Sequence, residues 1–317
     1  MPTAVRSSPQ STIAQATHRV ERPLLGLMLR ACAMLLLATM FMLVKLAGDS
    51  GVAAPEVMFW RQAVVIPTLL GGLALSGNLR LLRTARMPSH ARRAVTGTLG
   101  LLCNVSAAML LPLAEATTLG FTTPLFAVII TALVLRQHVG AWRWTAVALG
   151  FAGVLIVAQP GHVPVSMLGV AAGLGAGLIV AAVSFQIRDL SRTEAPVTCV
   201  FWFGFYGALF AGVLMPVYAT NHDAWQWLLL FGIGLAGTGA QLLITFALRH
   251  AAVATVIVMD YTALIWSTLY GWVIWDHLPA PVTWLGAPLI VAAGMMITWR
   301  EHRMARAVPP ATALEED

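Results

Sequence analysis

The chain has 317 residues, of which 59% are apolar and only 10% carry a charged side chain. Soluble domains carry charge on about 25% of their residues, so this composition excludes a soluble globular protein and places almost the whole chain in a lipid bilayer. The formal net charge of +6 is compatible with nucleic-acid binding. However, the basic residues lie between apolar segments, where they indicate membrane topology instead.

Ten apolar segments are long enough to cross a membrane as helices, which takes about 20 residues. In chain order they cover residues 31–48, 57–76, 94–113, 116–135, 142–159, 168–187, 197–217, 225–247, 252–275 and 282–299. We therefore predict an all-α membrane protein with ten transmembrane helices. Polar tails at 1–25 and 301–317 flank them, and the first tail lacks the apolar run of a secretory signal peptide.

Lysine and arginine divide the connections between these segments into two sets. Arginines, including Arg30, precede the first segment, and others follow the second, fourth, sixth, eighth and tenth. We place Arg92 and Arg93 in the connection after the second segment. The remaining connections carry no Lys or Arg, so the positive-inside rule predicts that both termini are cytosolic. This corresponds to a multi-pass protein of the cell inner membrane.

The fourth segment, residues 116–135, is interrupted by Gly120 and Pro124. A soluble core helix rarely tolerates both residues, whereas in lipid neighbouring helices and hydroxyls such as Thr122 and Thr123 can satisfy the freed backbone groups. We expect a broken membrane helix here.

A similar stretch recurs at 251–277, and aligning Gln137 with Asp276 brings Thr123 onto Thr262. The chain thus divides into halves of five segments, residues 26–160 and 161–300. Because five crossings reverse direction, the second half is expected to lie inverted relative to the first. Inverted repeats are typical of secondary transporters, which bind substrate near the midplane between the halves.

Glycine-rich stretches in the sixth and eighth segments point to close helix packing rather than to a phosphate-binding loop. Gly169, Gly173 and Gly177 lie on one face of the sixth segment. The eighth segment is crowded by glycines at 232, 234, 237 and 239.

Several motifs resemble the EamA branch of the drug/metabolite transporter superfamily. They are Phe59 to Arg61, the stretches 111–126, 150–160, 185–194 and 260–266, and Gln241. The resemblance covers about residues 25–305. It implies two EamA repeats of five helices, and it favours export because members of this branch export amino acids and related metabolites, including opine-type compounds.

The chain departs from the family where the fourth helix of each repeat ends. The family has Leu-Gly-Glu in the first repeat and Phe-Gly-Glu in the second. Here the corresponding residues are Leu135, Arg136 and Gln137, and then Trp275, Asp276 and His277. We interpret the glutamate as lost in the first repeat, with its acidity kept at Asp276 in the second.

Asp260 is the strongest candidate for a functional residue. It lies about 12 Å into the ninth segment at ~1.5 Å per residue, where a carboxylate costs about 3 kcal/mol to insert. Asp260 could bind a substrate amine or exchange a proton for substrate. Alternatively, it is structural, bonded to backbone freed at a helix break or paired with an arginine.

Arg61 in the second segment is the first partner to consider for Asp260, although their depths differ by about 10 Å. Arg61 could instead hold a substrate carboxylate in a two-point contact, or extend to the interface. Lys45 is expected to extend to the interface, and Glu56 could satisfy either cation.

Further polar and aromatic residues at membrane depth complete the predicted substrate site. An amide in lipid needs a hydrogen-bond partner, so these residues face the interior, either towards a ligand or as bonds between helices. The set comprises Asn104, Gln186, Tyr206, Gln241, Tyr261 and Trp266.

The sequence contains no catalytic constellation, no metal-ligand spacing among its eight histidines and no ATP-binding loop. We therefore expect a transporter rather than an enzyme, without metal or cofactor and without a nucleic-acid partner. Its partners are a small molecule and the bilayer, and a homodimer is left open. We expect export of a small polar, amino-acid-like or opine-type metabolite, driven by protons or its own gradient. The alternative is uptake of a metabolite such as riboflavin or S-adenosylmethionine.

Overall fold

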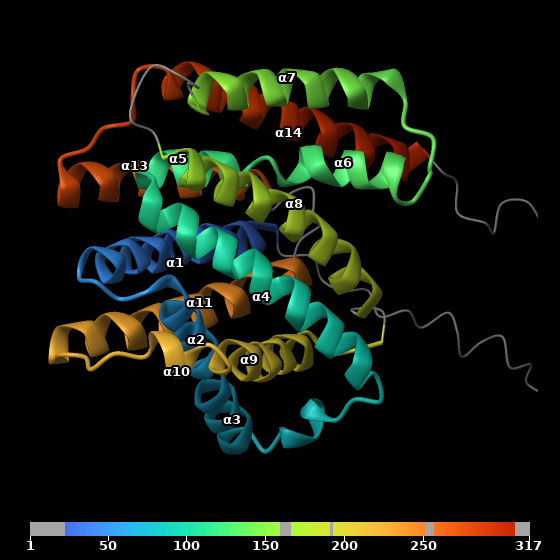
Figure 1. Cartoon of the computed structure of the whole chain (residues 1–317). Coiled ribbons are helices and arrows are strands. Elements are labelled where there is room, and N and C mark those ends of the chain that lie inside the picture. The colour runs from blue at the N-terminus through green and yellow to red at the C-terminus, as the bar shows by residue number, and fades with distance from the viewer. Residues whose placement is uncertain (1–22, 159–165, 191–192, 251–256, 308–317) are drawn as a thin grey trace, which may run out of the picture.

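The computed structural model describes residues 23–158, 166–190, 193–250 and 257–307. Every regular element in these ranges is helical (Figure 1). The elements are α1 (Pro23–Asp49), α2 (Ala54–Ala63), α3 (Val65–Leu75), η2 (Leu79–Leu82), α4 (Met87–Leu110), α5 (Leu113–Gly120), α6 (Thr123–Leu133), α7 (Ala141–Ala158), α8 (Met167–Leu190), α9 (Pro196–Gly212), α10 (Met215–Tyr218), α11 (Ala224–His250), η3 (Ile257–Tyr261), α13 (Thr262–Trp275) and α14 (Thr283–Ala307).

Within the described ranges, seven helices or broken helices are long and apolar enough to cross a membrane, which confirms an all-α protein with several membrane spans. Two further apolar helices, Pro196–Gly212 and Thr283–Trp299, are shorter. The start of the predicted ninth segment falls on residues 251–256, outside the described ranges. The outer parts of both tails, 1–22 and 308–317, and the connection at 159–165 also lie outside them.

The predicted break in the fourth segment is confirmed. Helix α5 ends at Gly120, and α6 begins at Thr123 with Pro124 in its first turn, where a missing N–H costs nothing. The hydroxyls at the break are satisfied locally, because Thr122 donates to the Leu119 carbonyl at 2.6 Å and Thr123 to the Gly120 carbonyl at 2.9 Å. Both bonds replace backbone pairing that lipid could not supply.

The second half has a matching break. The alignment of the two halves differs by one residue from the alignment expected from the sequence. Thr262 donates to the Met259 carbonyl at 2.6 Å, as Thr122 does to Leu119. At the other end of the same helices, Arg136 and Asp276 have φ values of 50° and 53°. Thr262 therefore corresponds to Thr122 rather than to Thr123.

This register also corrects the interpretation of Asp276. Arg136 and Asp276 occupy the positions where the family has glycine, and both adopt the left-handed conformation that glycine allows. Asp276 is the C-terminal cap of α13. It therefore does not preserve the family's glutamate, whose position is held by His277.

Each main helix contact between the halves has a counterpart in which the two halves have swapped roles (Figure 1). The first helix of each half packs against the third helix of the other, as α1 against α11 and α8 against α4. Likewise α13 lies against α1, and α5 and α6 lie against α8. The fifth helices, α7 and α14, pair with each other, as do α2 and α9.

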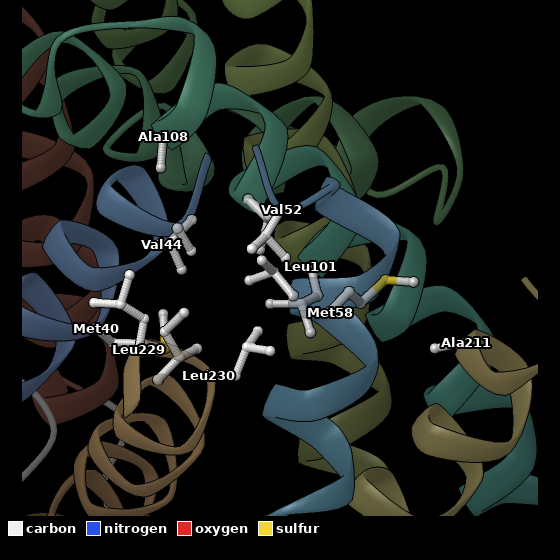
Figure 2. Packing of buried hydrophobic residues seen from close by; sticks show 13 residues of the cluster. Met40, Val44, Val52, Met58, Leu101, Ala108, Ala211, Leu229 and Leu230 are labelled. Atoms are coloured by element: carbon white, nitrogen blue, oxygen red, sulfur yellow. The ribbon is translucent and has the colours of Figure 1, made fainter. Parts of the chain in front are cut away.

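The predicted packing role of the glycines is confirmed by their surroundings. A methyl group on Gly169 would lie 2.8 Å from Leu111, and one on Gly173 would lie 2.9 Å from Leu119. In α11, Gly234 makes similar close contact with Val64. The largest buried apolar cluster lies where α1, α2, α4 and α11 meet (Figure 2), and it includes Met40.

Arg93 does not lie in a connection, because α4 begins at Met87 and carries it into the helix bundle. Its side chain is 4% exposed, and its guanidinium lies 4.2 Å from the centre of the Phe203 ring. Attraction to the ring face partly offsets the cost of burying this charge.

The crossing of α7 and α14 yields a stability prediction. A methyl group on Gly153 would lie 2.7 Å from the Gly286 carbonyl oxygen, whereas one on Gly72 in α3 would meet nothing within 4 Å. Gly153→Ala should destabilise the protein by about 1–3 kcal/mol through overpacking. Gly72→Ala should be neutral or slightly stabilising. Thermal unfolding in detergent measures both, and equal midpoints for the two variants would contradict the packing model.

Candidate functional site

A cavity of about 540 Å³ lies between the two halves of the chain. Its walls come from α1, α2, α4, α5, α6, α8, α11, η3, α13 and α14, so both halves contribute. Most of the wall is apolar, and a few polar side chains converge on it. Four of them, Arg61, Asn104, Gln241 and Tyr261, were predicted together with Asp260 to form the substrate site, and all five line the cavity.

The partner of Asp260 is Arg30 rather than Arg61. Arg30 Nε donates to Asp260 Oδ1 at 2.5 Å, and Arg30 Nη2 donates to Oδ2 at 2.7 Å. The two side chains are 13% and 26% exposed. Parallel bonds of this kind fix the geometry and are stronger than bonds between neutral groups. The pair therefore compensates the charge of Asp260 and ties η3 to α1 across the cavity wall.

Sequence reasoning missed Arg30 because it assigned this residue to the connection before the first segment. Helix α1 instead begins at Pro23, so Arg30 lies in its third turn. A usable signal was present, because Arg30, Met34, Leu37 and Phe41 follow the spacing of one helix face. All four line the cavity.

Arg61 has no carboxylate within 4 Å among the described residues. Its Nε contacts Met40 Sδ at 3.3 Å, and its Nη1 reaches Gln62 Oε1 at 3.5 Å, which is at the limit of a hydrogen bond. Gly237 of α11 makes room for it, since a methyl group there would lie 3.3 Å from Arg61 Nε. Arg61 thus presents a weakly bonded cation to the cavity.

The uncharged polar residues of the cavity keep hydrogen-bonding capacity. Among the described residues, Asn104 Nδ2 donates only to the Gly100 carbonyl of its own helix, at 3.3 Å. Tyr261 lies edge-on to Phe121 with ring centres 5.0 Å apart. In the corrected register these two aromatic residues correspond to each other, so the contact lies where the two halves meet.

Two predicted site residues lie elsewhere. The Tyr206 hydroxyl contacts Met87 Sδ at 3.7 Å, and its ring packs against Trp202 and Phe210. Trp266 is partly buried but does not line the cavity. The sequence correctly placed both in apolar helices, but the helix face that each occupies points away from the cavity.

A second, smaller chamber of about 260 Å³ adjoins the cavity at Leu113 and Ser267, which line both. Ser267 and Thr117 share a hydrogen bond of 2.7 Å there. Lys45 lines this chamber and donates to the Leu111 carbonyl at 2.9 Å, at the end of α4. Its ammonium thus satisfies a helix terminus inside the bundle.

Glu56 pairs with neither Arg61 nor Lys45. Glu56 Oε1 lies 2.6 Å from His222 Nε2, and its Oε2 accepts a bond from Thr220 at 3.3 Å. His222 Nδ1 lies 3.2 Å from Gln226 Oε1, and Gln226 donates to the Ser50 carbonyl at 2.8 Å. We name Glu56, Thr220, His222 and Gln226 the Glu56 cluster.

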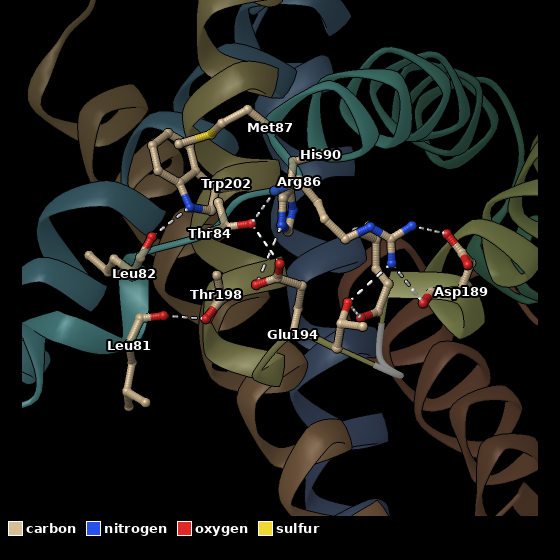
Figure 3. Close-up of polar contacts among 12 residues, drawn as sticks. Leu81, Leu82, Thr84, Arg86, Met87, His90, Asp189, Glu194, Thr198 and Trp202 are labelled. Carbon is tan, nitrogen blue, oxygen red and sulfur yellow. Dashed lines mark hydrogen bonds and ion pairs between the residues drawn. The ribbon is translucent and has the colours of Figure 1, made fainter.

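A second polar group joins the segment before α4 to the segment before α9 (Figure 3). Thr84 donates to Glu194 Oε1 at 2.6 Å, and Arg86 pairs with Asp189 at 2.5 Å. His90 Nε2 is 4.0 Å from Glu194 Oε2, too far for a hydrogen bond. We name Thr84, Arg86, His90, Asp189 and Glu194 the Glu194 cluster.

The Arg30–Asp260 pair should show strong energetic coupling. Removing either partner by Arg30→Gln or Asp260→Asn leaves the other poorly compensated. The double variant should therefore be more stable than the sum of the single effects predicts, by about 1–3 kcal/mol. The more exposed Arg86–Asp189 pair is the control, with an expected coupling below about 1 kcal/mol. Thermal unfolding of both double-mutant cycles gives the values, and additive effects at Arg30 and Asp260 would disprove the coupling.

Comparisons with known proteins agree with this architecture. A solved crystal structure with 20% sequence identity matches 88% of this chain and 98% of its own, with a TM-score of 0.58, and so shares the fold. The chain is 31% identical to a riboflavin transporter of Rhizobium johnstonii, over 94% of this chain and 97% of the relative. It is 29% identical to the pseudopaline exporter CntI of Pseudomonas aeruginosa, over 84% and 94%.

A more distant relative is an S-adenosylmethionine uptake transporter of Rickettsia prowazekii, at 25% identity over 78% of this chain and 84% of the relative. The model of the EamA-like transporter family matches twice, at residues 24–159 and 167–299. Together these matches cover most of the chain and leave only short stretches at its ends and middle. The chain therefore belongs to the EamA-like transporter family.

Proposed function

We propose that this protein is an inner-membrane secondary transporter that exports a small polar, amino-acid-like or opine-type metabolite by alternating access. The observation that carries the proposal is the cavity of about 540 Å³ between the halves, with converging charged and polar groups. Pockets of about 300–1,000 Å³ suit small organic ligands. Ionisable side chains at membrane depth usually belong to a transport path.

The proposed topology has ten crossings, two inverted halves (26–160 and 161–300) and both termini in the cytosol. Seven spans of sufficient length, two shorter apolar helices and the pair η3 and α13 supply ten candidates. Arginine-rich and arginine-free connections alternate along this order, which supports the orientation. The double family match supports the division into halves.

An amino-acid-like substrate fits the charges of the cavity. Arg61 can bind a carboxylate at two points, and it has no carboxylate partner among the described side chains. Asn104, Gln241 and Tyr261 can bond the uncharged polar groups of the substrate. Asp260 is available to a substrate amine when the substrate competes with Arg30.

Proton coupling through Asp260 would involve the same competition. Both carboxylate oxygens accept bonds from Arg30, so a proton on Asp260 has to displace at least one of them. Substrate export down its own gradient requires no such step. Both driving forces remain part of the proposal, and Asp260→Asn distinguishes them, because proton-coupled transport would lose its pH dependence.

Uptake is the competing direction. A riboflavin transporter and an S-adenosylmethionine uptake transporter are among the relatives, beside an exporter. The cavity geometry is compatible with either direction, because alternating access is reversible in principle.

Metabolite profiling of medium and cells tests the proposal directly. Cells that overproduce the protein should enrich a small polar compound in the medium, relative to cells lacking it. Asn104→Trp should abolish this change because the indole fills the cavity. Leu99→Trp is the control, since Leu99 lies on the same helix and is 53% exposed on its outer face.

Enrichment inside the cells would reverse the proposed direction while retaining the cavity as the path. The proposal is rejected if no compound changes with the presence of the protein, or if Asn104→Trp transports normally.

A further inference from the structure

The Glu56 and Glu194 clusters occupy corresponding junctions at opposite ends of the bundle. One joins α2 to the segment before α11, and the other joins α9 to the segment before α4. Exchange of the halves therefore interchanges the junctions, because α2 corresponds to α9 and α4 to α11. The residues themselves do not align one to one, but each junction contains a threonine and a histidine beside a glutamate.

Helix α4 places the two clusters far apart. It begins beside the Glu194 cluster and ends at Leu110, and the next residue, Leu111, bonds Lys45 near the end of α1. The Glu56 cluster also contacts the end of α1, through Gln226 and Ser50. With 24 residues, α4 spans about 36 Å at ~1.5 Å per residue, which is the separation expected for two ends of a membrane bundle.

The two clusters differ in the contact between histidine and glutamate. In the Glu56 cluster, glutamate and histidine are both 1% exposed and 2.6 Å apart. In the Glu194 cluster the corresponding distance is 4.0 Å, and neither nitrogen of the fully buried His90 has a hydrogen-bond partner among the residues that the structure describes. A buried polar group without a partner is unfavourable, so a hydrogen bond between His90 and Glu194 in another state would lower the free energy of that state.

The shape of the cavity agrees with this difference. Its lining extends towards the Glu194 end as far as Ser184, which is exposed and lies near the end of α8. Towards the Glu56 end it stops at Leu113 and the Thr117–Ser267 bond. The cavity thus gives way to the smaller chamber on the side where the His222–Glu56 contact is formed.

We propose that the Glu56 and Glu194 clusters are paired closures that alternate during transport, so that His90–Glu194 contact forms as His222–Glu56 contact breaks. This inference rests on the proposed alternating access. It assigns Glu56, His222, His90 and Glu194 as positioning residues outside the substrate cavity. In the conformation described here, the His222–Glu56 contact is formed. The His90–Glu194 contact is open, although Thr84 still bonds Glu194 at 2.6 Å and Arg86 still pairs with Asp189.

Alternating closures predict effects of opposite sign. Glu56→Gln weakens the closure formed here and should favour opening at the Glu56 end. Glu194→Gln weakens the closure of the other state and should disfavour that opening. Each substitution replaces a charged acceptor by a neutral amide and so weakens the hydrogen bond, and each variant should shift the equilibrium about tenfold. The double variant Glu56→Gln/Glu194→Gln should return close to the starting value.

Labelling of Ser267→Cys by a membrane-impermeant maleimide measures this equilibrium without any substrate. Ser267 is 1% exposed and lies at the boundary between cavity and chamber. The native Cys32, Cys103 and Cys199 are replaced by alanine, and the reagent is added on the side where α1 ends. Labelling should accelerate about tenfold in Glu56→Gln, slow about tenfold in Glu194→Gln, and recover in the double variant.

Changes of the same sign in both single variants would indicate general loosening of the fold and overturn the proposal. Unchanged rates would also overturn it, since neither cluster would then control access. Because labelling needs no substrate, these outcomes are separate from a failure of the export experiment.

Discussion

Lipid offers no hydrogen bonds, so every polar group that this chain carries into the bilayer must find its partner within the protein. The bidentate contact between Arg30 and Asp260 is the clearest consequence. It joins the first helix of one half to the broken fourth helix of the other half, beside the cavity. The cavity can hold a carboxylate at this depth because a guanidinium from the opposite half meets it there.

The same constraint explains the broken helices. Where α5 gives way to α6, and η3 to α13, threonine hydroxyls bond carbonyls three residues back. These breaks allow Gly120 and Asp260, which correspond in the two halves, to approach the cavity. Glycines such as Gly173 and Gly177 then let α8 pack directly against the broken helix. The cavity between the halves thus lies where the broken helices are interrupted and where α8 packs closely against one of them.

The sequence predicted the features that depend on local chemistry. Apolar length located the membrane helices, and Gly120 with Pro124 located the break in the fourth segment. It did not predict contacts that depend on which face of a helix points inward. Tyr206 and Trp266 were predicted for the site but lie outside the cavity lining, whereas Arg30 was overlooked because the apolar run begins after it.

The buried histidines illustrate the same limit. His90 and His222 lie between the apolar segments of the sequence, yet tertiary packing buries both side chains beside glutamates. Their partners, Glu194 and Glu56, are far away in sequence, so no local pattern could reveal the pairs. The exchange of helix contacts between the halves, which only the structure reveals, shows that the two junctions correspond.

The central claim is that one cavity between the halves is reached from each side of the membrane in turn. Thiol labelling of Asn104→Cys in membrane vesicles of both orientations tests it most directly, in a background without the native cysteines. The account predicts labelling from both sides, and none for Leu99→Cys on the outer face of the same helix. Labelling of Asn104→Cys from one side only, or from neither, would contradict alternating access through this cavity.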